Sequence, residues 1–399
     1  MNTIYFCSMN APTISFDNTQ IAFQSLSNFE LKKAHFLFQV FQNQFLVKVG
    51  SSFTEYALHW GLPIGPFVKP TIFKHFCSGE NLEESTILIR ALAQKNVGVL
   101  LNYGVEAKET DEEYEKSIQQ SLKAIRLAGT EKNIKAVCIK LTGFGRIALF
   151  EKLQQKATLS DSEQAELDQI NTRFDILCEA ALSNDVAIYI DAEESWIQNP
   201  IDEMTLIRMK KYNQKKAIVC NTYQLYRNDK LTDLRQEIEL AKKEKFILGV
   251  KIVRGAYVEK EAEYATAHQA KSPIHATKAG SDADFNEALQ LCIDNIESVS
   301  VCVASHNEES CLLLTTILAN KNIPFNHPHI CVSQLYGMGD HITYNLLSLG
   351  LNCTKYMPYG PIKEVIPYLI RRAQENGSVN GQMGRELKLL KTEIQRRRI

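Results

Sequence analysis

The sequence lacks several features that would point to a particular class of protein. Its 399 residues carry a net charge of −1, so no basic excess indicates binding to nucleic acid. No apolar run approaches the roughly 18–20 residues that a membrane-spanning helix needs. The N-terminus has no basic segment followed by an apolar segment, which is the pattern of a secretory signal. We therefore expect a cytoplasmic protein with no transmembrane segment and no nucleic-acid partner.

Motifs for common metal and nucleotide sites are also missing. The ten cysteines form no CxxC pair, and most lie in apolar runs, as Cys138 and Cys302 do. They are better explained as buried, reduced thiols than as disulfides. The segment GFGR at 143–146 lacks the third glycine of a Rossmann fingerprint. The histidines of HPH at 327–329 precede a predicted strand, and we expect no metal site.

What is present is a regular alternation of short apolar runs with helical segments. Residues from about 17 to 95 have helical spacing of apolar residues, most clearly over 31–60. Eight nearly continuous apolar runs follow, at 97–104, 136–143, 186–193, 217–223, 247–255, 300–307, 330–337 and 353–360. Such runs are typical of parallel strands buried on both faces, and the segments between them, such as 111–129, are long enough for crossover helices. The pattern predicts an α/β fold, a (βα)8 TIM-like barrel at 96–399 after an N-terminal helical arm at 1–95. An open doubly wound sheet is the competing architecture.

Polar side chains follow the apolar core of nearly every run. They are Glu106, Lys140, Asp191, Glu193, Glu194, Gln224, Lys251, Arg254, His306, Asn307, Gln334, Lys355 and Tyr356. In a barrel, these positions lie at the carboxyl ends of the strands, where active sites are built. Lys140, Lys251 and Lys355 are each placed to serve as the lysine of a Schiff-base aldolase. Gln224, Lys251, Arg254 and His306 are the residue types that could hold a flavin instead.

The segment YLIRRAQENG at 368–377 places several charges on one helical face. Tyr368, Arg371, Arg372 and Glu375 fall at offsets of 0, 3, 4 and 7 residues. Asn376-Gly377 predicts the end of this helix, whereas Pro361 and Pro367 both fit its first turn. Two adjacent arginines suit a carboxylate or phosphate ligand, but on the helix alone a solvated surface explains them equally well.

These segments resemble the motifs of a known family. YLIRRAQENG is similar to the C-terminal signature of proline dehydrogenases, and VKIVRGAYVEKE at 250–261 is similar to the motif of their fifth strand. Shorter matches occur in the same order along the chain: IKLTG at 139–143, IDAEE at 190–194, TYQ at 222–224, ASHN at 304–307 and QLYGMGD at 334–340. The resemblance spans roughly residues 97–385 and is weaker in the N-terminal helical region.

The resemblance implies a distorted (βα)8 barrel that binds FAD non-covalently. It implies oxidation of L-proline to Δ1-pyrroline-5-carboxylate, with the electrons passed to a quinone at a membrane surface, and hence a peripheral location at the inner face of the membrane. The residues matched to substrate contacts are Lys140, Arg371 and Arg372 for the carboxylate, Tyr257, Leu335, Tyr356 and Tyr368 around the ring, and Asp191 beside them. Those matched to the cofactor are Lys251 near flavin N5, with Gln224, Arg254, Gly255, Ala256, Ser305, His306, Asn307 and Glu375.

Three positions depart from the pattern of the family. Residue 251 is lysine where arginine is frequent, which replaces a forked contact by a single charge. Residue 258 is valine where an aromatic residue is common, and residue 305 is serine where threonine is common. None of these changes removes a group that the chemistry must have.

Other functions stay open on the sequence. A hydroxyproline dehydrogenase is the alternative enzyme, although a phenol at Tyr356 facing the ring would leave little room for a 4-hydroxyl group. A cofactor-free barrel that serves as a binding module is the alternative from another class. A metal-dependent or Schiff-base lyase is the third.

Overall fold

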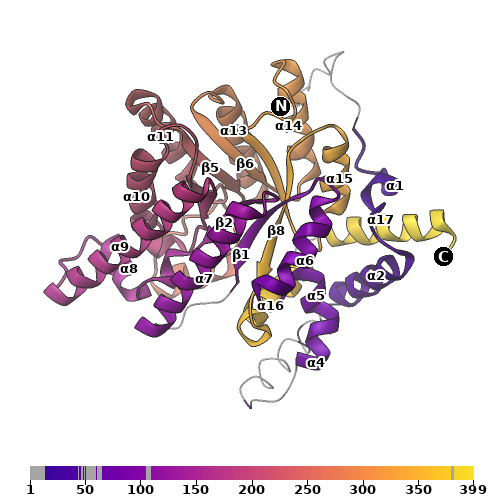
Figure 1. Cartoon of the computed structure of the whole chain (residues 1–399), viewed down its shortest axis with the longest axis horizontal. Helices are drawn as coiled ribbons and strands as arrows, with labels where there is room; N and C mark the ends of the chain where they lie inside the picture. The colour runs from indigo at the N-terminus through magenta and orange to yellow at the C-terminus, as the bar shows by residue number, and fades with distance from the viewer. Residues whose placement is uncertain are drawn as a thin grey trace. The chain divides into compact units, whose positions relative to one another are not determined.

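The computed structural model describes residues 14–43, 45, 48, 50, 60, 65–104, 109–378 and 382–399, and it leaves out the side chains of 67, 371–378, 382 and 383 (Figure 1). The chain divides into two compact units. We call the segment Ala107–Val332 the central unit, and Ile14–Glu106 with Ser333–Ile399 the terminal unit.

The central unit contains five consecutive parallel strands. They are β2 (Ile134–Ile139), β3 (Ala187–Ile190), β4 (Val219–Gln224), β5 (Leu248–Val253) and β6 (Val299–Ala304). Each strand pairs with the next one along the chain, from β2 with β3 to β5 with β6. All six residues of β4 are buried, as expected where both faces of a parallel sheet are covered.

Helices connect these strands. They are α7 (Asp111–Thr130), α8 (Ile147–Gln154), α9 (Asp161–Asn184), α10 (Ser195–Tyr212), α11 (Lys230–Glu244), α12 (Val258–Ala267), α13 (Lys278–Asp294) and α14 (Glu308–Asn320). Local sequence explains several of the helix starts. Thr110, Thr277 and Asn307 each accept a hydrogen bond from a backbone N–H of the first turn. Ser160 and Glu163 form a complete capping box at the start of α9.

The terminal unit contains two further strands and the helices that precede and follow them. Strand β1 (Gly98–Tyr103) pairs in parallel with β8 (Cys353–Tyr359). The helices before β1 are α1 (Thr19–Ala22), α2 (Asn28–Gln42), α4 (Gly65–Val68), a π-helical turn (Lys69–Phe73), α5 (Lys74–Phe76) and α6 (Leu82–Ala93). Those near the C-terminus are α15 (Asp340–Ser348), α16 (Ile362–Ser378) and α17 (Gln382–Arg397). Helix α17, yellow in Figure 1, lies beside α2.

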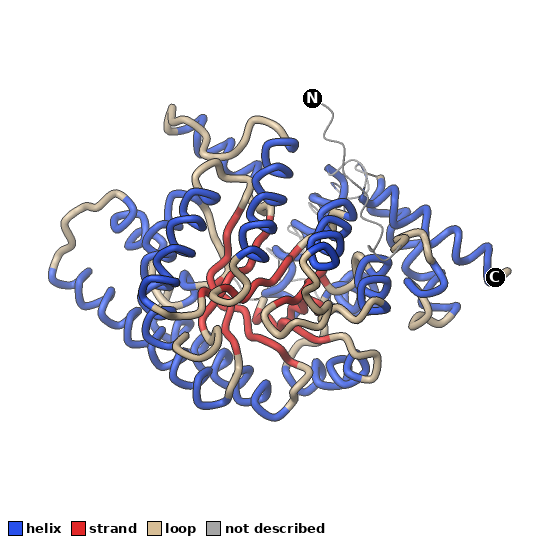
Figure 2. The backbone as a smooth tube through the Cα atoms, turned by 90° about the horizontal axis from the view of Figure 1, so that it is seen from above, coloured by secondary structure: helices blue, strands red, loops and turns tan. Residues whose placement is uncertain are grey.

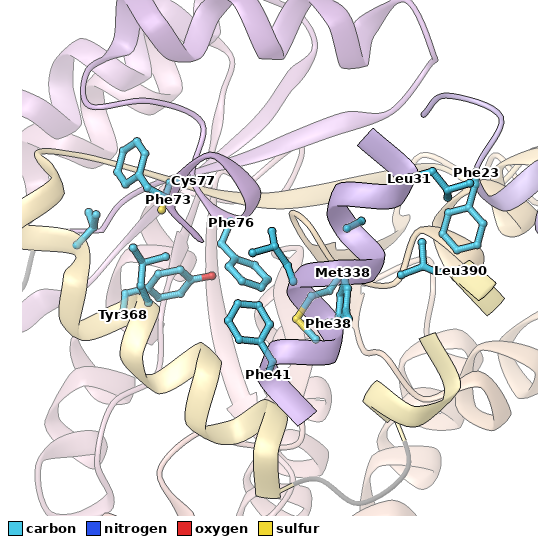
Figure 3. Packing of buried hydrophobic residues seen from close by; sticks show 14 of the residues in the cluster. Phe23, Leu31, Phe38, Phe41, Phe73, Phe76, Cys77, Met338, Tyr368 and Leu390 are labelled. Atoms are coloured by element: carbon cyan, nitrogen blue, oxygen red, sulfur yellow. The ribbon is translucent and has the colours of Figure 1, made fainter. Parts of the chain in front are cut away.

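One apolar cluster holds the helices of the terminal unit together. Its members include Phe38 and Phe41 of α2, Phe76 of α5, Tyr368 of α16, and Met338 in the loop before α15. The rings of Phe41 and Phe76 have centroids 5.8 Å apart, and Figure 3 shows the Tyr368 ring beside Phe76. The N-terminal helices therefore pack on α16 of the same unit, so Tyr368 contributes to this core.

The strand order is β1 to β8 in a closed barrel, with β7 (Ile330–Leu335) between β6 and β8. Figure 2 distinguishes the strands, in red, from the helices, in blue, that alternate with them. The predicted (βα)8 TIM-like fold with helices before its first strand is confirmed, and the open doubly wound sheet is wrong. The predicted domain boundary at residues 95 and 96 stays a prediction.

Some predicted boundaries differ from the observed ones. Helix α2 ends at Gln42, and most of the remainder of the predicted helical stretch to residue 60 lies outside the described residues. Helix α16 continues to Ser378, one residue past the predicted stop at Gly377. Its start is settled by Pro361, whose carbonyl accepts the N–H groups of Glu364 and Val365, so Pro367 lies inside the helix. The nine cysteines among the described residues are free thiols, as predicted, and only Cys331 of these is not fully buried.

Candidate active site

Lys140 follows β2 directly and precedes a short 3-10 turn (Leu141–Gly143). Its side chain is 31% exposed. The Nζ atom donates to the hydroxyl of Tyr257 at 3.4 Å and lies 4.0 Å from Oε2 of Glu193. Tyr257 is buried and precedes the first residue of α12. The segments after β2 and β5 thus bring Lys140 and Tyr257 together, and the predicted contact of both residues with a substrate stays a prediction.

Asp191 and Lys251 form a buried ion pair between β3 and β5. Asp191 comes directly after β3, and its Oδ1 accepts a hydrogen bond from Lys251 Nζ. The two side chains are 11% and 5% exposed. Burial by itself would lower the pKa of the Lys251 ammonium, but the Asp191 carboxylate and the nearby cysteine thiols together outweigh this effect, and the pKa of Lys251 is raised. Lys251 therefore carries a fixed positive charge inside the central unit, where its Nζ also lies 5.7 Å from the centroid of the Tyr189 ring.

Gln224 is the last residue of β4 and is 2% exposed. Its side-chain oxygen Oε1 is buried and has no hydrogen-bond partner among the described residues. A buried acceptor without a donor destabilises a native structure by about 1–3 kcal/mol, and such groups require an explanation. A bound ligand that donates a hydrogen bond would supply it, which fits the predicted cofactor contact.

Arg254, just after β5, binds three partners through all three of its guanidinium nitrogens. Nε donates to Asp282 at 2.6 Å, and the two terminal nitrogens donate to the hydroxyls of Ser305 and Ser310, each at 2.9 Å. Burial would raise the pKa of Asp282, but hydrogen bonds from Lys278 and Arg254 lower it. Arg254 and Ser305, both predicted cofactor contacts, are thus fixed side by side, and an anionic ligand would share the arginine with Asp282.

The loop after β5 requires glycine at position 255. Gly255 has φ +141°, a conformation that side chains with a Cβ rarely adopt. A Cβ there would lie 2.3 Å from Cδ1 of Tyr226, so the loop and the tyrosine ring are in close contact. The next residue, Ala256, is exposed. The backbone at 255–256 is therefore accessible on one side and tightly packed on the other.

After β6, the predicted cofactor residues have different local roles. Ser305 accepts a hydrogen bond from the backbone N–H of Asn307 at 3.0 Å. Asn307 caps α14, because its Oδ1 accepts from the N–H of Ser310 at 2.8 Å. His306, between them, is half-buried. The cap gives Asn307 a structural role that the sequence analysis did not assign, and its contact with a cofactor stays a prediction.

The remaining predicted residues belong to the terminal unit. Leu335 at the end of β7 is partly buried against the apolar cluster, to which Tyr368 also belongs. Tyr356 lies in β8 and is half-buried. Arg371, Arg372 and Glu375 are in α16, but their side chains lie outside the described part of the structure. The predicted binding of a carboxylate by the two arginines therefore stays a prediction.

Comparison with known proteins gives the family. A family model described as proline dehydrogenase matches residues 87–385. The chain belongs to the proline dehydrogenase family. Membership of this family supports an oxidoreductase that acts on proline.

Individual relatives of the proline dehydrogenase family extend the match. The chain is 32% identical over 322 residues to the carbapenem antibiotics biosynthesis protein CarD of Pectobacterium carotovorum subsp. carotovorum, covering 81% of this chain and 83% of that protein. It is 31% identical over 379 residues to proline dehydrogenase 1, mitochondrial, of Dictyostelium discoideum, covering 84% and 66%. In structure it is similar to proline utilization A (PutA) from Bdellovibrio bacteriovorus inactivated by N-propargylglycine, with a TM-score of 0.70 at 19% identity, over 92% of this chain and 37% of PutA.

Two charged strand-end residues that the sequence analysis named are buried and have partners within this member of the proline dehydrogenase family. Glu193 contacts Lys140 and Thr142, and we return to it below. Lys355 in β8 is 1% exposed, pairs with Asp340 at 2.6 Å and donates to the carbonyl of Met338 at 2.6 Å. The burial and the partners of these two residues could not be predicted from the sequence, because a charged residue at a strand end is more often exposed than buried.

Three further observations concern possible metal ligands, membrane-spanning helices and the charge of Lys251. In the described ranges, no group of three or more His, Cys, Asp or Glu side chains could hold a metal ion. In the same ranges, no helix is long and apolar enough to cross a bilayer. The raised pKa of Lys251 keeps this lysine protonated, which is unfavourable for the nucleophile of a Schiff-base enzyme.

Proposed function

We propose that the protein oxidises L-proline to Δ1-pyrroline-5-carboxylate by hydride transfer to FAD. The observation that carries this proposal is a pair of contacts, Lys140 with Tyr257 and Lys251 with Asp191, made by residues within or just after β2, β3 and β5 in a chain of the proline dehydrogenase family. These residues provide one fixed cation inside the site, one half-exposed cation and a phenol, which suit an anionic ring substrate next to an electron-accepting cofactor.

The residues of the central unit fit a flavin in three respects. The unsatisfied Oε1 of Gln224 can accept from a cofactor N–H group. The Lys251 ammonium is held charged by Asp191 and can stabilise negative charge on a reduced flavin. The accessible backbone at 255–256 allows close approach of a ligand. The residues that we propose to hold FAD are Gln224, Lys251, Arg254, Gly255, Ala256, Ser305, His306, Asn307 and Glu375. Bound FAD would supply the hydride acceptor.

The substrate is oriented by charge and shape. We propose that Lys140, Arg371 and Arg372 bind the proline carboxylate through charge-assisted hydrogen bonds. Tyr257, Leu335, Tyr356 and Tyr368 surround the ring, and Asp191 closes the site beside Lys251. Proline would bind with its amine neutral, so that the nitrogen lone pair assists the departure of hydride from Cδ. No strong general base is then required, and kcat/KM should rise with pH toward the pKa of the amine. A flat pH profile would count against a neutral amine.

The arginines give the most direct test of substrate binding. A hydrogen bond to a charged group contributes about 1.5–3 kcal/mol, so Arg371→Ala or Arg372→Ala should raise the proline KM roughly 10-fold to 150-fold. Arg385→Ala is the matched control, because Arg385 of α17 pairs with Asp17 at 2.7 Å and has no proposed part in the site. If both variants keep the wild-type KM, the arginines do not bind the carboxylate.

The proposed electron acceptor is a quinone at a membrane surface, with the protein cytoplasmic and peripheral at the inner face. Anaerobic reduction by L-proline, followed by reoxidation with a quinone, tests this proposal. Addition of L-proline to the purified protein without oxygen should bleach the flavin absorbance, and a soluble quinone analogue should restore it. Protein that is purified without a flavin spectrum would instead favour a cofactor-free binding module.

Hydroxyproline is the alternative substrate. Tyr356 is half-buried in β8, and a phenol that faces the ring leaves little room for a 4-hydroxyl group. We therefore expect faster turnover of L-proline than of 4-hydroxyproline, and Tyr356→Ser should reduce this preference. Equal turnover of both substrates by the wild-type protein would remove the proposed specificity.

A further inference from the structure

Glu193 is a buried carboxyl group that the proposed mechanism does not use. It lies in the loop between β3 and α10, two residues after Asp191, and is 4% exposed. Burial of a carboxylate is unfavourable unless the group is paired and hydrogen-bonded. The contacts of Glu193 therefore indicate what it does.

The carboxyl group of Glu193 binds the turn that follows β2. Its Oε1 accepts the backbone N–H of Thr142 at 3.2 Å, and its Oε2 accepts the hydroxyl of Thr142 at 2.6 Å. The same Oε2 lies 4.0 Å from Nζ of Lys140, two residues earlier. One carboxyl group thus fixes the backbone beside Lys140 and contacts the lysine itself.

Glu193 is in turn fixed from the side of α10. Its backbone N–H donates to Oε1 of Gln198 at 2.6 Å, and Nε2 of Gln198 donates to Oδ1 of Asp202 at 2.7 Å. Asp202 is anchored by Lys230, whose Nζ lies 2.8 Å from Oδ2. The hydrogen bonds therefore run without interruption from a buried ion pair near α11 to the turn beside Lys140.

Lys140 needs such support because its side chain is long and half-exposed. An unsupported lysine side chain samples many rotamers, and ordering it opposes ligand binding. The hydroxyl of Tyr257 at 3.4 Å and the carboxyl of Glu193 at 4.0 Å restrict the ammonium from two sides. Burial raises the pKa of Glu193, and the nearby Lys140 charge and the Thr142 hydrogen bonds counteract this rise, so the charge of the carboxyl group depends on these same partners.

We infer that Glu193 is a positioning residue that acts through Lys140, by fixing the turn at Thr142 and holding the lysine ammonium where it meets the substrate carboxylate. This inference rests on the proposed function, in which Lys140 binds that carboxylate. Glu193 itself does not touch the substrate in this arrangement. Its loss should weaken the binding of proline and leave the oxidation step of bound proline nearly unchanged.

The test is a double-mutant cycle on the flavin-containing protein. Glu193→Gln, Lys140→Gln and the double variant are assayed for proline KM and kcat, and for the affinity of cyclopentanecarboxylate, a ring carboxylate without the amine, by calorimetry. Displacement of a binding group costs up to about 100-fold, so we expect Glu193→Gln to raise KM and the carboxylate Kd between about 10-fold and 100-fold, with kcat within about twofold. The double variant should match Lys140→Gln alone, because Glu193 has nothing left to position.

A matched control and a second variant separate this role from general damage. Glu166→Gln makes the same substitution in a carboxylate that pairs with Arg146 at 2.6 Å, and it should leave KM unchanged. Thr142→Val removes the hydroxyl that donates to Glu193 with little change of shape, and it should raise KM only when Lys140 is present. If Glu193→Gln does not fold, Thr142→Val takes its place in the double-mutant cycle with Lys140→Gln.

The outcomes distinguish the inference from the proposed function. If Lys140→Gln raises KM but neither Glu193→Gln nor Thr142→Val does, the inference fails and the proposed function stands. If the effects of Glu193→Gln and Lys140→Gln multiply in the double variant, Glu193 does not act through Lys140. If Lys140→Gln changes neither KM nor the carboxylate Kd, the proposed role of Lys140 fails and the inference fails with it.

Discussion

Removal of one partner from the buried Lys251–Asp191 pair should lower the free energy of unfolding strongly. Lys251→Met leaves the Asp191 carboxylate, only 11% exposed, without the ammonium that compensates its charge. Removal of one partner from a buried ion pair typically destabilises a protein by about 3–5 kcal/mol, mostly through the charge that remains. Asp191→Leu should have a similar effect for the opposite reason, since it leaves the ammonium buried.

The double variant Lys251→Met/Asp191→Leu should be more stable than either single variant, because no uncompensated charge remains. We expect a coupling free energy of about 2–3 kcal/mol in urea unfolding followed by circular dichroism, at equal flavin occupancy. Lys242→Met is the control, because Lys242 pairs with Glu239 at 2.6 Å but the two side chains are 42% and 71% exposed. Exposed pairs contribute about 0.2–1 kcal/mol. If Lys251→Met costs no more than Lys242→Met, the charge of Asp191 is not desolvated and the reasoning is wrong.

Three further changes test other parts of the structure. Burial raises the pKa of Glu237 from 4.5 to about 7. Between these two pH values the folded protein holds a proton that the unfolded chain has released, so the free energy of unfolding should fall as the pH rises from about 4.5 to about 7. Glu237→Gln should therefore match the wild type near pH 5 and exceed it at pH 8 by roughly 2 kcal/mol, with thermal unfolding at both pH values as the measurement. Gly337 has φ +81°, and a Cβ there would lie 2.1 Å from the carbonyl oxygen of His75, so Gly337→Ala should lower the unfolding free energy strongly. Gly350→Ala is the control, because φ is +89° there but, apart from its chain neighbours, no described residue has an atom within 4 Å of the added Cβ, and the expected cost is about 1–2 kcal/mol. Gln224→Met should stabilise the flavin-free protein by about 1–3 kcal/mol while reducing its flavin content, and unchanged flavin content would exclude Gln224 as a ligand contact.

The strands could be predicted from the sequence because their signal is local. A run of apolar residues buried on both faces does not depend on which strand is its neighbour, and each of the eight predicted runs overlaps a strand of the barrel. The predicted ends were less accurate. The run 186–193 extends three residues past β3, which ends at Ile190, because Asp191, Ala192 and Glu193 are also buried.

The partners of the charged residues could not be predicted, because they are set by the fold. Lys251 and Asp191 lie 60 residues apart in the sequence, and Thr142 and Glu193 lie 51 apart. The sequence analysis placed Lys140, Asp191 and Lys251 at strand ends, but nothing local to Asp191 selects Lys251 over Lys140. The arginines of α16 are a different case, since the helix itself was predicted and their side-chain contacts lie outside the described residues.

The three acidic residues after β3 show how one loop can serve several partners. Asp191 binds Lys251 of β5, Glu193 binds the turn after β2, and Glu194 pairs with Lys260 of α12 at 2.7 Å. Because each carboxylate is committed to a different segment, a movement of the loop would break contacts on several sides at once. This arrangement holds the two lysines of the proposed site in place before a ligand arrives, and such preorganisation reduces the cost of ordering side chains on binding. Gln224 differs in this respect, because its buried oxygen has no partner in the described part of the chain and a ligand can satisfy it. The central unit therefore combines charges fixed by the protein with an acceptor left for the ligand, and this contrast favours a cofactor at the end of β4.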